Sequence, residues 1–117
     1  IADGGTARVS LYRAEPRRWP LAIAMLERHP LGSQLVMPLS GEPFLVVVAP
    51  PGEVPDRQAV RAFLTNGRQG VNYRRGTWHH PLIALAAGDF LVLDRAGPGP
   101  NCDEFHFPDG GLLLPKP

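Results

Sequence analysis

Two short stretches of the sequence contain side chains that could do acid–base or metal chemistry. The first holds Glu27 and His29. On a β-strand these two positions point to the same face, so a carboxylate and an imidazole would project side by side. A neutral imidazole binds transition metals and is also a base near physiological pH. The alternative is that the pair lies on a solvated strand face, and periodicity alone does not decide between the two.

The second stretch spans residues 72–81 and ends in two adjacent histidines before a proline. Neighbouring residues of a strand face opposite sides, so we expect only one of His79 and His80 to enter a given pocket. Pro81 disfavours a helical conformation for the residue before it, which supports an extended backbone. The alternative is one packed and one exposed histidine beside a core Trp78.

The spacing of these residues is similar to that of the two motifs of cupin barrels. The first cupin motif has two histidines separated by one residue, then a glutamate, then a glycine seven positions later. Here Glu27 replaces the first histidine, Gln34 replaces the glutamate, and Gly41 keeps its place. The second motif has a histidine three residues after a glycine, as Gly76 and His79 do. Because a glutamine amide is a poor transition-metal ligand, a metal-free site stays open.

The elements that must position these residues are predicted to be short strands. Fourteen Pro and thirteen Gly in 117 residues favour turns over long helices, and the apolar stretches between them are short. We expect two hairpins, one joining 34–39 to 43–49 and one joining 82–86 to 90–94, and a single helical turn at 56–60. Further strands are predicted at 8–14, 21–28, 61–65, 70–73, 77–81 and 103–107, although the composition of 21–28 would also suit a short helix. The pattern indicates an all-β sandwich or barrel forming one domain over residues 1–117.

The composition excludes several classes of partner and location. Twelve Lys and Arg against eleven Asp and Glu leave a net charge of +1, so we expect no nucleic-acid partner. The single Cys102 cannot form an internal disulfide and favours a reducing compartment. No apolar run reaches membrane-spanning length. We therefore expect a cytoplasmic protein with no membrane partner.

Seven strings, in order along the chain, carry a more specific resemblance. They are residues Leu26–Gln34, Phe44–Ala49, Arg61–Gly67, Gly70–Tyr73, Thr77–Leu82, Asp89–Arg95 and Asn101–Asp103. Together they resemble the ureidoglycolate lyase family, also described as ureidoglycolate hydrolase. The resemblance implies a cupin-type double-stranded β-helix, or jelly-roll, barrel. Members of the family begin with a further segment before the first strand, so we expect this barrel to lack its N-terminal segment.

The resemblance also implies a reaction and a set of site residues. The reaction is the cleavage of ureidoglycolate to glyoxylate and urea in allantoin and purine nitrogen catabolism, with a small carboxylate as substrate. The implied catalytic residues are His79, His29 and Glu27, and the same three are the candidate ligands of a divalent transition metal. No nucleotide or organic cofactor is expected. The candidate substrate-binding residues are Gln34, Asn72, Tyr73, Arg74 and Arg61, although an aromatic packed at a barrel end is the alternative for Tyr73.

Two other functions remain open at this point. The first is a non-catalytic cupin barrel that binds a small carboxylate as a sensor or subunit, since a fold does not fix a function. The second is another small-molecule cupin enzyme, such as an isomerase or a dioxygenase. We also expect a homodimer, because the apolar runs 45–48 and 112–114 exceed what a small barrel interior needs.

Overall fold

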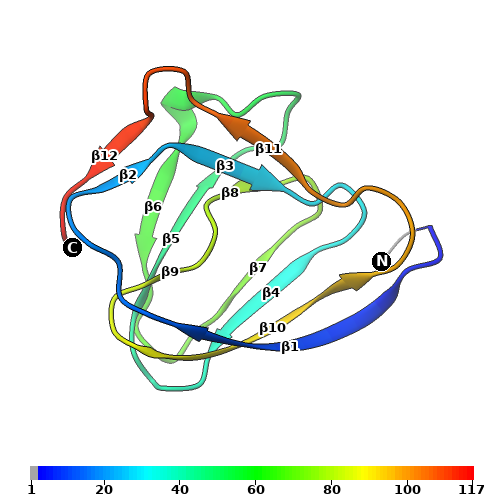
Figure 1. Cartoon of the computed structure of the whole chain (residues 1–117), viewed down its shortest axis with the longest axis horizontal. Helices are drawn as coiled ribbons and strands as arrows, with labels where there is room; N and C mark the ends of the chain where they lie inside the picture. Colours follow the sequence, from blue (N-terminus) through cyan, green and yellow to red (C-terminus); the bar gives the residue numbers. More distant parts are fainter. Residues whose placement is uncertain (1–2) are drawn as a thin grey trace.

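The computed structural model describes residues 3–117 and is built almost entirely of strands (Figure 1). The strands are β1 (Thr6–Ala14), β2 (Leu21–Ile23), β3 (Met25–Arg28), β4 (Gln34–Pro38), β5 (Phe44–Ala49), β6 (Arg61–Leu64), β7 (Val71–Tyr73), β8 (Trp78–His79), β9 (Ile83–Ala84), β10 (Gly88–Ala96), β11 (Asp103–His106) and β12 (Leu112–Leu114). The predicted helical turn is the 3-10 helix η1 (Arg57–Ala59), capped by the Asp56 side chain. Within residues 3–117 there is no helix long and apolar enough to cross a membrane.

The strands form two sheets and a small ribbon, and every strand pairing within the described chain is antiparallel. The four-stranded sheet has the order β1-β10-β4-β7. The six-stranded sheet has the order β11-β3-β8-β5-β6, with β9 also paired to β5, and β12 pairs with β2. The predicted all-β class is confirmed, and the arrangement is compatible with a cupin-like β-barrel.

Both predicted hairpins are wrong, although their strands exist. β4 pairs with β10 and β7, whereas β5 pairs with β6, β8 and β9. After β4 the chain crosses to the other sheet, so Val36 and Phe44 pack in one core cluster instead of lying side by side in one sheet. In the same way β9 joins β5, and β10 joins β1 and β4. Burial of apolar faces between sheets has therefore overridden the short-range turn signals.

Strand β5 is buried on both faces, and this explains its unbroken apolar sequence. Phe44 and Val46 belong to the core cluster that includes residues of the four-stranded sheet. Leu45 and Val47 belong to a second cluster that includes Ile23 and Trp78. Most of the apolar run 45–48, which suggested a dimer surface, is consequently internal. Leu45, Val46 and Val47 are 7%, 6% and 0% exposed, and Val48 is half-buried.

The pairing register brings the two chemistry-bearing stretches together. Glu27 on β3 lies opposite His79 on β8, although 52 positions separate them in the sequence. In the other sheet, Gln34 on β4 lies opposite Tyr73 on β7. Each sheet therefore contributes one cross-strand pair, and the region between these two pairs is where a site can form.

Candidate active site

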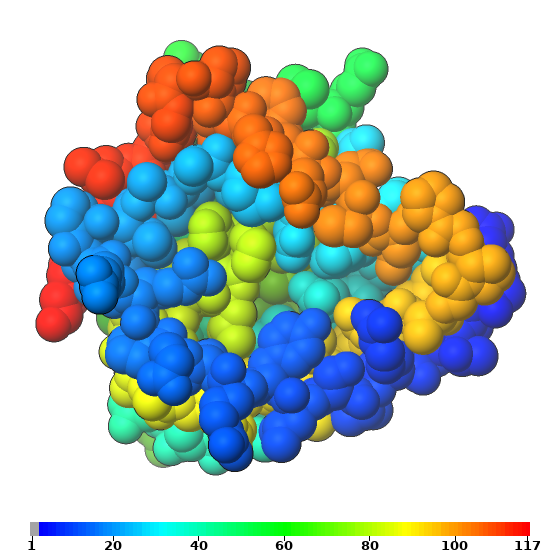
Figure 2. All heavy atoms as spheres, in the orientation of Figure 1, coloured from blue at the N-terminus to red at the C-terminus, as the bar shows by residue number. Residues whose placement is uncertain are grey.

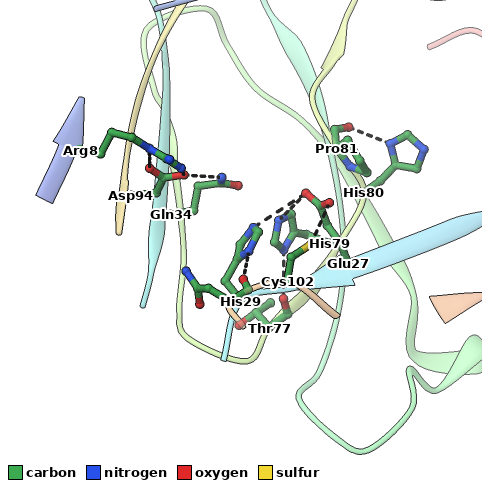
Figure 3. A network of polar contacts seen from close by, with 11 residues as sticks. Arg8, Glu27, His29, Gln34, Thr77, His79, His80, Pro81, Asp94 and Cys102 are labelled. Carbon is green, nitrogen blue, oxygen red and sulfur yellow. Dashed lines mark hydrogen bonds and ion pairs between the residues drawn. The ribbon is translucent and has the colours of Figure 1, made fainter. Parts of the chain in front are cut away.

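Three side chains converge near the cross-strand pair of β3 and β8. They are Glu27, His29 and His79 (Figure 3). Oε1 of Glu27 lies 3.5 Å from Nε2 of His79 and 3.8 Å from Nε2 of His29. The centroids of the two imidazole rings are 5.0 Å apart. His79 is 1% exposed, while Glu27 and His29 are partly buried. The convergence of these three residues agrees with the arrangement expected from the sequence.

The hydrogen bond made by Nδ1 of each imidazole fixes the tautomer of the ring. Nδ1 of His29 lies 2.8 Å from the carbonyl oxygen of Asn101, and Nδ1 of His79 lies 3.0 Å from the carbonyl oxygen of Thr77. A carbonyl oxygen only accepts, so both Nδ1 atoms carry the hydrogen. In the neutral rings the lone pair is then on Nε2. Both Nε2 atoms are buried and have no hydrogen-bond partner within residues 3–117.

Two lone pairs and a carboxylate that face one another require a hydrogen-bond donor or a positive charge between them. Burial opposes ionisation of Glu27, but the contacts with His79, His29 and Cys102 outweigh it and hold the pKa of Glu27 below its ordinary value. Glu27 is thus an acceptor, and so are both Nε2 atoms. Either a proton on one imidazole or a bound cation resolves this clustering of acceptors.

The donor set fits a divalent transition metal. Imidazole nitrogen and carboxylate oxygen are its common ligands, and ligating histidines usually donate their second N–H to a carbonyl, as both do here. Two atoms that each lie about 2.1 Å from one ion stand about 3.0–3.4 Å apart. The observed separations of 3.5 and 3.8 Å are slightly wider. Glu27, His29 and His79 are therefore a candidate metal-ligand set.

Tyr73 and Gln34 form the facing wall of a pocket. The ring of Tyr73 stacks on His79 with centroids 4.0 Å apart and planes 10° from parallel. Burial first, and then the negative charge of Glu27, raise the pKa of Tyr73, so its hydroxyl stays protonated. Gln34 lies at the same pocket and donates a 3.4 Å hydrogen bond to Asp94. Figure 2 shows a hollow on this side of the molecule, between the blue atoms of β1 and those of β3.

The other three predicted substrate-binding residues lie at a different groove. Asn72, Arg74 and Arg61 line it together with apolar residues of β5 and β6. Asn72 points away from the cluster because it alternates with Tyr73 along β7. The guanidinium of Arg61 donates to two backbone carbonyls, those of Gln58 and Val60. The structure does not bring these three residues to the cluster, and their contact with substrate stays a prediction.

Two residues with polar side chains in the lining of the pocket were not predicted from the sequence. Tyr12 lines it from β1, and the alternating sequence of that strand was the only signal of its direction. His80 was expected to face away from the pocket of His79, yet it also contributes to the lining and is 8% exposed. Strand β8 ends at His79, so strict alternation does not extend to His80. Its Nδ1 lies 2.7 Å from the Pro81 carbonyl oxygen, and burial lowers the pKa of this imidazole.

The sequence also contained no signal for three contacts around the cluster. Sγ of Cys102 lies 3.8 Å from Oε2 of Glu27. Arg8 forms a two-pronged ion pair with Asp94, which Gln34 also contacts. These pairs join residues 60 to 86 positions apart in the chain, so only the tertiary fold reveals them.

Comparison with known proteins completes the description of the site. The family model for ureidoglycolate lyase matches residues 1–113. This chain belongs to the ureidoglycolate lyase family. A relative in Pseudomonas syringae pv. syringae, named ureidoglycolate lyase, is 58% identical over 124 residues, covering 100% of this chain and 73% of that protein. A relative of the same name in Azotobacter vinelandii is 61% identical over 113 residues, covering 95% of this chain and 68% of that protein. The family indicated by the seven sequence strings is thus confirmed.

Proposed function

We propose that this chain cleaves ureidoglycolate to glyoxylate and urea at the cluster of Glu27, His29 and His79. The observation that carries the proposal is the pair of buried Nε2 atoms, both without a hydrogen bond within residues 3–117 and both directed at one carboxylate. Relatives more than half identical in sequence are named for this reaction. Reactive groups with unsatisfied hydrogen-bonding capacity are expected where a ligand completes the site.

The reaction needs one proton to leave the substrate and one to return. The hydroxyl of the carbinol carbon loses a proton as its oxygen becomes the aldehyde oxygen of glyoxylate. The bond from this carbon to the ureido nitrogen breaks, and that nitrogen gains a proton to give urea. In the metal-free form of the site, Nε2 of His79 or His29 accepts the first proton, Glu27 stabilises the imidazolium, and the same N–H supplies the second.

The same three residues would hold a divalent transition metal in the alternative form of the site. Such an ion supplies positive charge that polarises a coordinated oxygen. Within residues 3–117, the pocket lined by Glu27 and His79 has no Arg or Lys, whereas Arg8 and Arg95 lie at the adjoining hollow lined by His29. A cation held by the cluster would therefore supply the positive charge that faces a substrate carboxylate inside the pocket. Gln34 and the protonated hydroxyl of Tyr73 offer the polar groups that a ureido group requires.

Glyoxylate release from ureidoglycolate, above the spontaneous rate, is the direct test. We expect His79→Ala to abolish most of the glyoxylate release. His106→Ala is the matched control: His106 also contacts a glutamate, Glu104, at 3.2 Å, but this pair lies on the exposed surface, so the release should be unchanged. Chelator treatment followed by single divalent metals distinguishes the two forms of the site. Release that persists undiminished in chelator assigns the metal-free form, and no release with any added metal refutes the function.

The oligomeric part of the proposal concerns the outer face of the four-stranded sheet. Val9 and Leu11 on β1 are 66% and 62% exposed, and Leu93 and Leu91 lie opposite them on β10. Leu35 and Met37 of β4 continue the same face. An apolar face across three strands supports association with a second copy. Light scattering at micromolar concentration should give a dimer, and Leu11→Arg should give a monomer. A wild-type monomer refutes this part.

The proposed cytoplasmic location has one supporting observation. Cys102 is a free thiol that contacts Glu27 at the edge of the site, and a reducing compartment preserves it.

A further inference from the structure

Three consecutive residues, Asn101, Cys102 and Asp103, lead into β11 and contact the end of β3 and the turn that follows it. We infer that this segment is a positioning device for Glu27 and His29, and that Asn101 is its principal residue. The inference deepens the proposed function, since it takes the cluster as the reacting site. It concerns residues that contact the cluster ligands from outside and that the reaction itself does not require.

Asn101 makes two contacts of different kinds. Its backbone carbonyl accepts from Nδ1 of His29 at 2.8 Å, and its side-chain Oδ1 accepts from the backbone N–H of Leu31 at 2.8 Å. The second bond anchors residue 101 against the turn that follows His29. The first bond then fixes the tautomer and the direction of the ring. Without the anchor, no side-chain bond holds this carbonyl in place opposite Nδ1 of His29.

The next two residues, Cys102 and Asp103, make further contacts with β3. Sγ of Cys102 lies 3.8 Å from Oε2 of Glu27, which leaves Oε1 to face the two imidazoles. The carboxylate of Asp103 accepts from Nε of Arg28 at 2.9 Å, at the first paired position of β11 and β3. The contacts of this segment thus fall on Glu27, Arg28, His29 and Leu31.

A purely structural role would lower stability without altering the cluster, so the test needs a readout at His29. Replacing a group that hydrogen-bonds to a ligating histidine typically lowers activity or metal affinity by about 10- to 100-fold. We expect Asn101→Ala to lower kcat by about this factor with KM changed less than about threefold. In the metal-free protein, the imidazole nitrogen NMR spectrum should change from a uniformly Nδ1-protonated His29 to a mixture of tautomers.

Two variants serve as matched comparisons. Asn101→Asp keeps an oxygen that can accept from Leu31, so His29 should remain Nδ1-protonated. Asn66→Ala removes the same kind of bond, a 2.8 Å contact from the backbone N–H of Arg68, in an exposed turn, and should leave kcat and the His29 spectrum unchanged. The inference is overturned if Asn101→Ala retains kcat within twofold, or loses it only in proportion to unfolding while His29 keeps a single tautomer.

A second pair of variants decides the question if Asn101→Ala does not fold. Cys102→Ala should lower kcat, and Cys102→Ser, which restores a donor toward Glu27, should recover most of it. Equal activity in both variants and the wild type overturns the inference. If the wild-type protein releases no glyoxylate, the proposed function fails, but the His29 spectra of Asn101→Ala and Asn101→Asp still decide whether the segment positions the ring.

Discussion

Replacement of Glu27 by glutamine should separate activity from stability in this protein. The substitution keeps the shape of the side chain but removes the charge that faces two imidazoles. At 3.5 Å from Nε2 of His79, and with an effective dielectric constant of about 20, a unit charge on that ring interacts with the carboxylate by about 4–5 kcal/mol. If roughly half of this is lost on forming an imidazolium, kcat falls about 30- to 100-fold.

Stability should change much less than activity. A glutamine amide can donate hydrogen bonds, and the two buried Nε2 atoms are acceptors without a partner in residues 3–117. One new bond contributes about 0.5–1.5 kcal/mol and offsets the stabilisation that the ionised carboxylate gains through its lowered pKa, so the melting temperature of the metal-free protein should stay within a few degrees of the wild type.

The assay combines glyoxylate release with thermal unfolding in chelator. Glu104→Gln is the matched control, because Glu104 faces His106 at 3.2 Å with both side chains more than half exposed, and exposed pairs contribute little. The reasoning is refuted if Glu27→Gln keeps kcat within threefold. It is also refuted if that variant unfolds several degrees below the wild type, since the two Nε2 atoms would then not be acceptors that lack a donor.

Three further predictions concern the fold. Phe44→Ala empties a core position that is 1% exposed, and urea denaturation should reveal a loss of about 3–5 kcal/mol; a loss below about 1 kcal/mol contradicts the packing described. Gly111→Ala should be poorly folded by circular dichroism, because φ is +84° and a Cβ would lie 1.8 Å from the Ile23 carbonyl oxygen; a wild-type melting curve contradicts this. Hydrogen bonds from Arg57 and from a backbone N–H lower the pKa of Asp109, so this carboxylate stabilises the fold above its ordinary pKa of 3.8 and the benefit disappears as the pH falls through the lowered value. Asp109→Asn should therefore be slightly less stable at neutral pH and equal to the wild type in strong acid, and a constant difference in stability across that range contradicts the assignment.

The composition of the cluster could be predicted from the sequence because it depends on local rules. Positions 27 and 29 share a strand face, and the interval from Gly76 to His79 resembles a known motif. The pairing of Glu27 with His79 then supplies the tertiary contact. The same alternation separates Asn72 from Tyr73, so a contiguous polar stretch did not enter one pocket as a unit.

Other parts of the structure depend on choices that local patterns do not encode. The turn residues at 40–42 are compatible with a hairpin or with a crossing between sheets, and only the burial of both faces of β5 decides between them. The segment 101–103 makes its contacts with residues 70 to 75 positions away. Those contacts arise from the register of β11 on β3, which no short window of sequence specifies.

The division of the pocket between two sheets has a consequence for protein engineering. Glu27 and His79 belong to one sheet and Gln34 and Tyr73 to the other, so the width available to a substrate is set by the spacing of the sheets. That spacing is maintained by interior side chains such as Phe44, which touches Phe90 edge to face with centroids 5.4 Å apart. Substituting a smaller or larger side chain at such a core position should change the size of substrate that the pocket accepts, while every reactive residue stays the same.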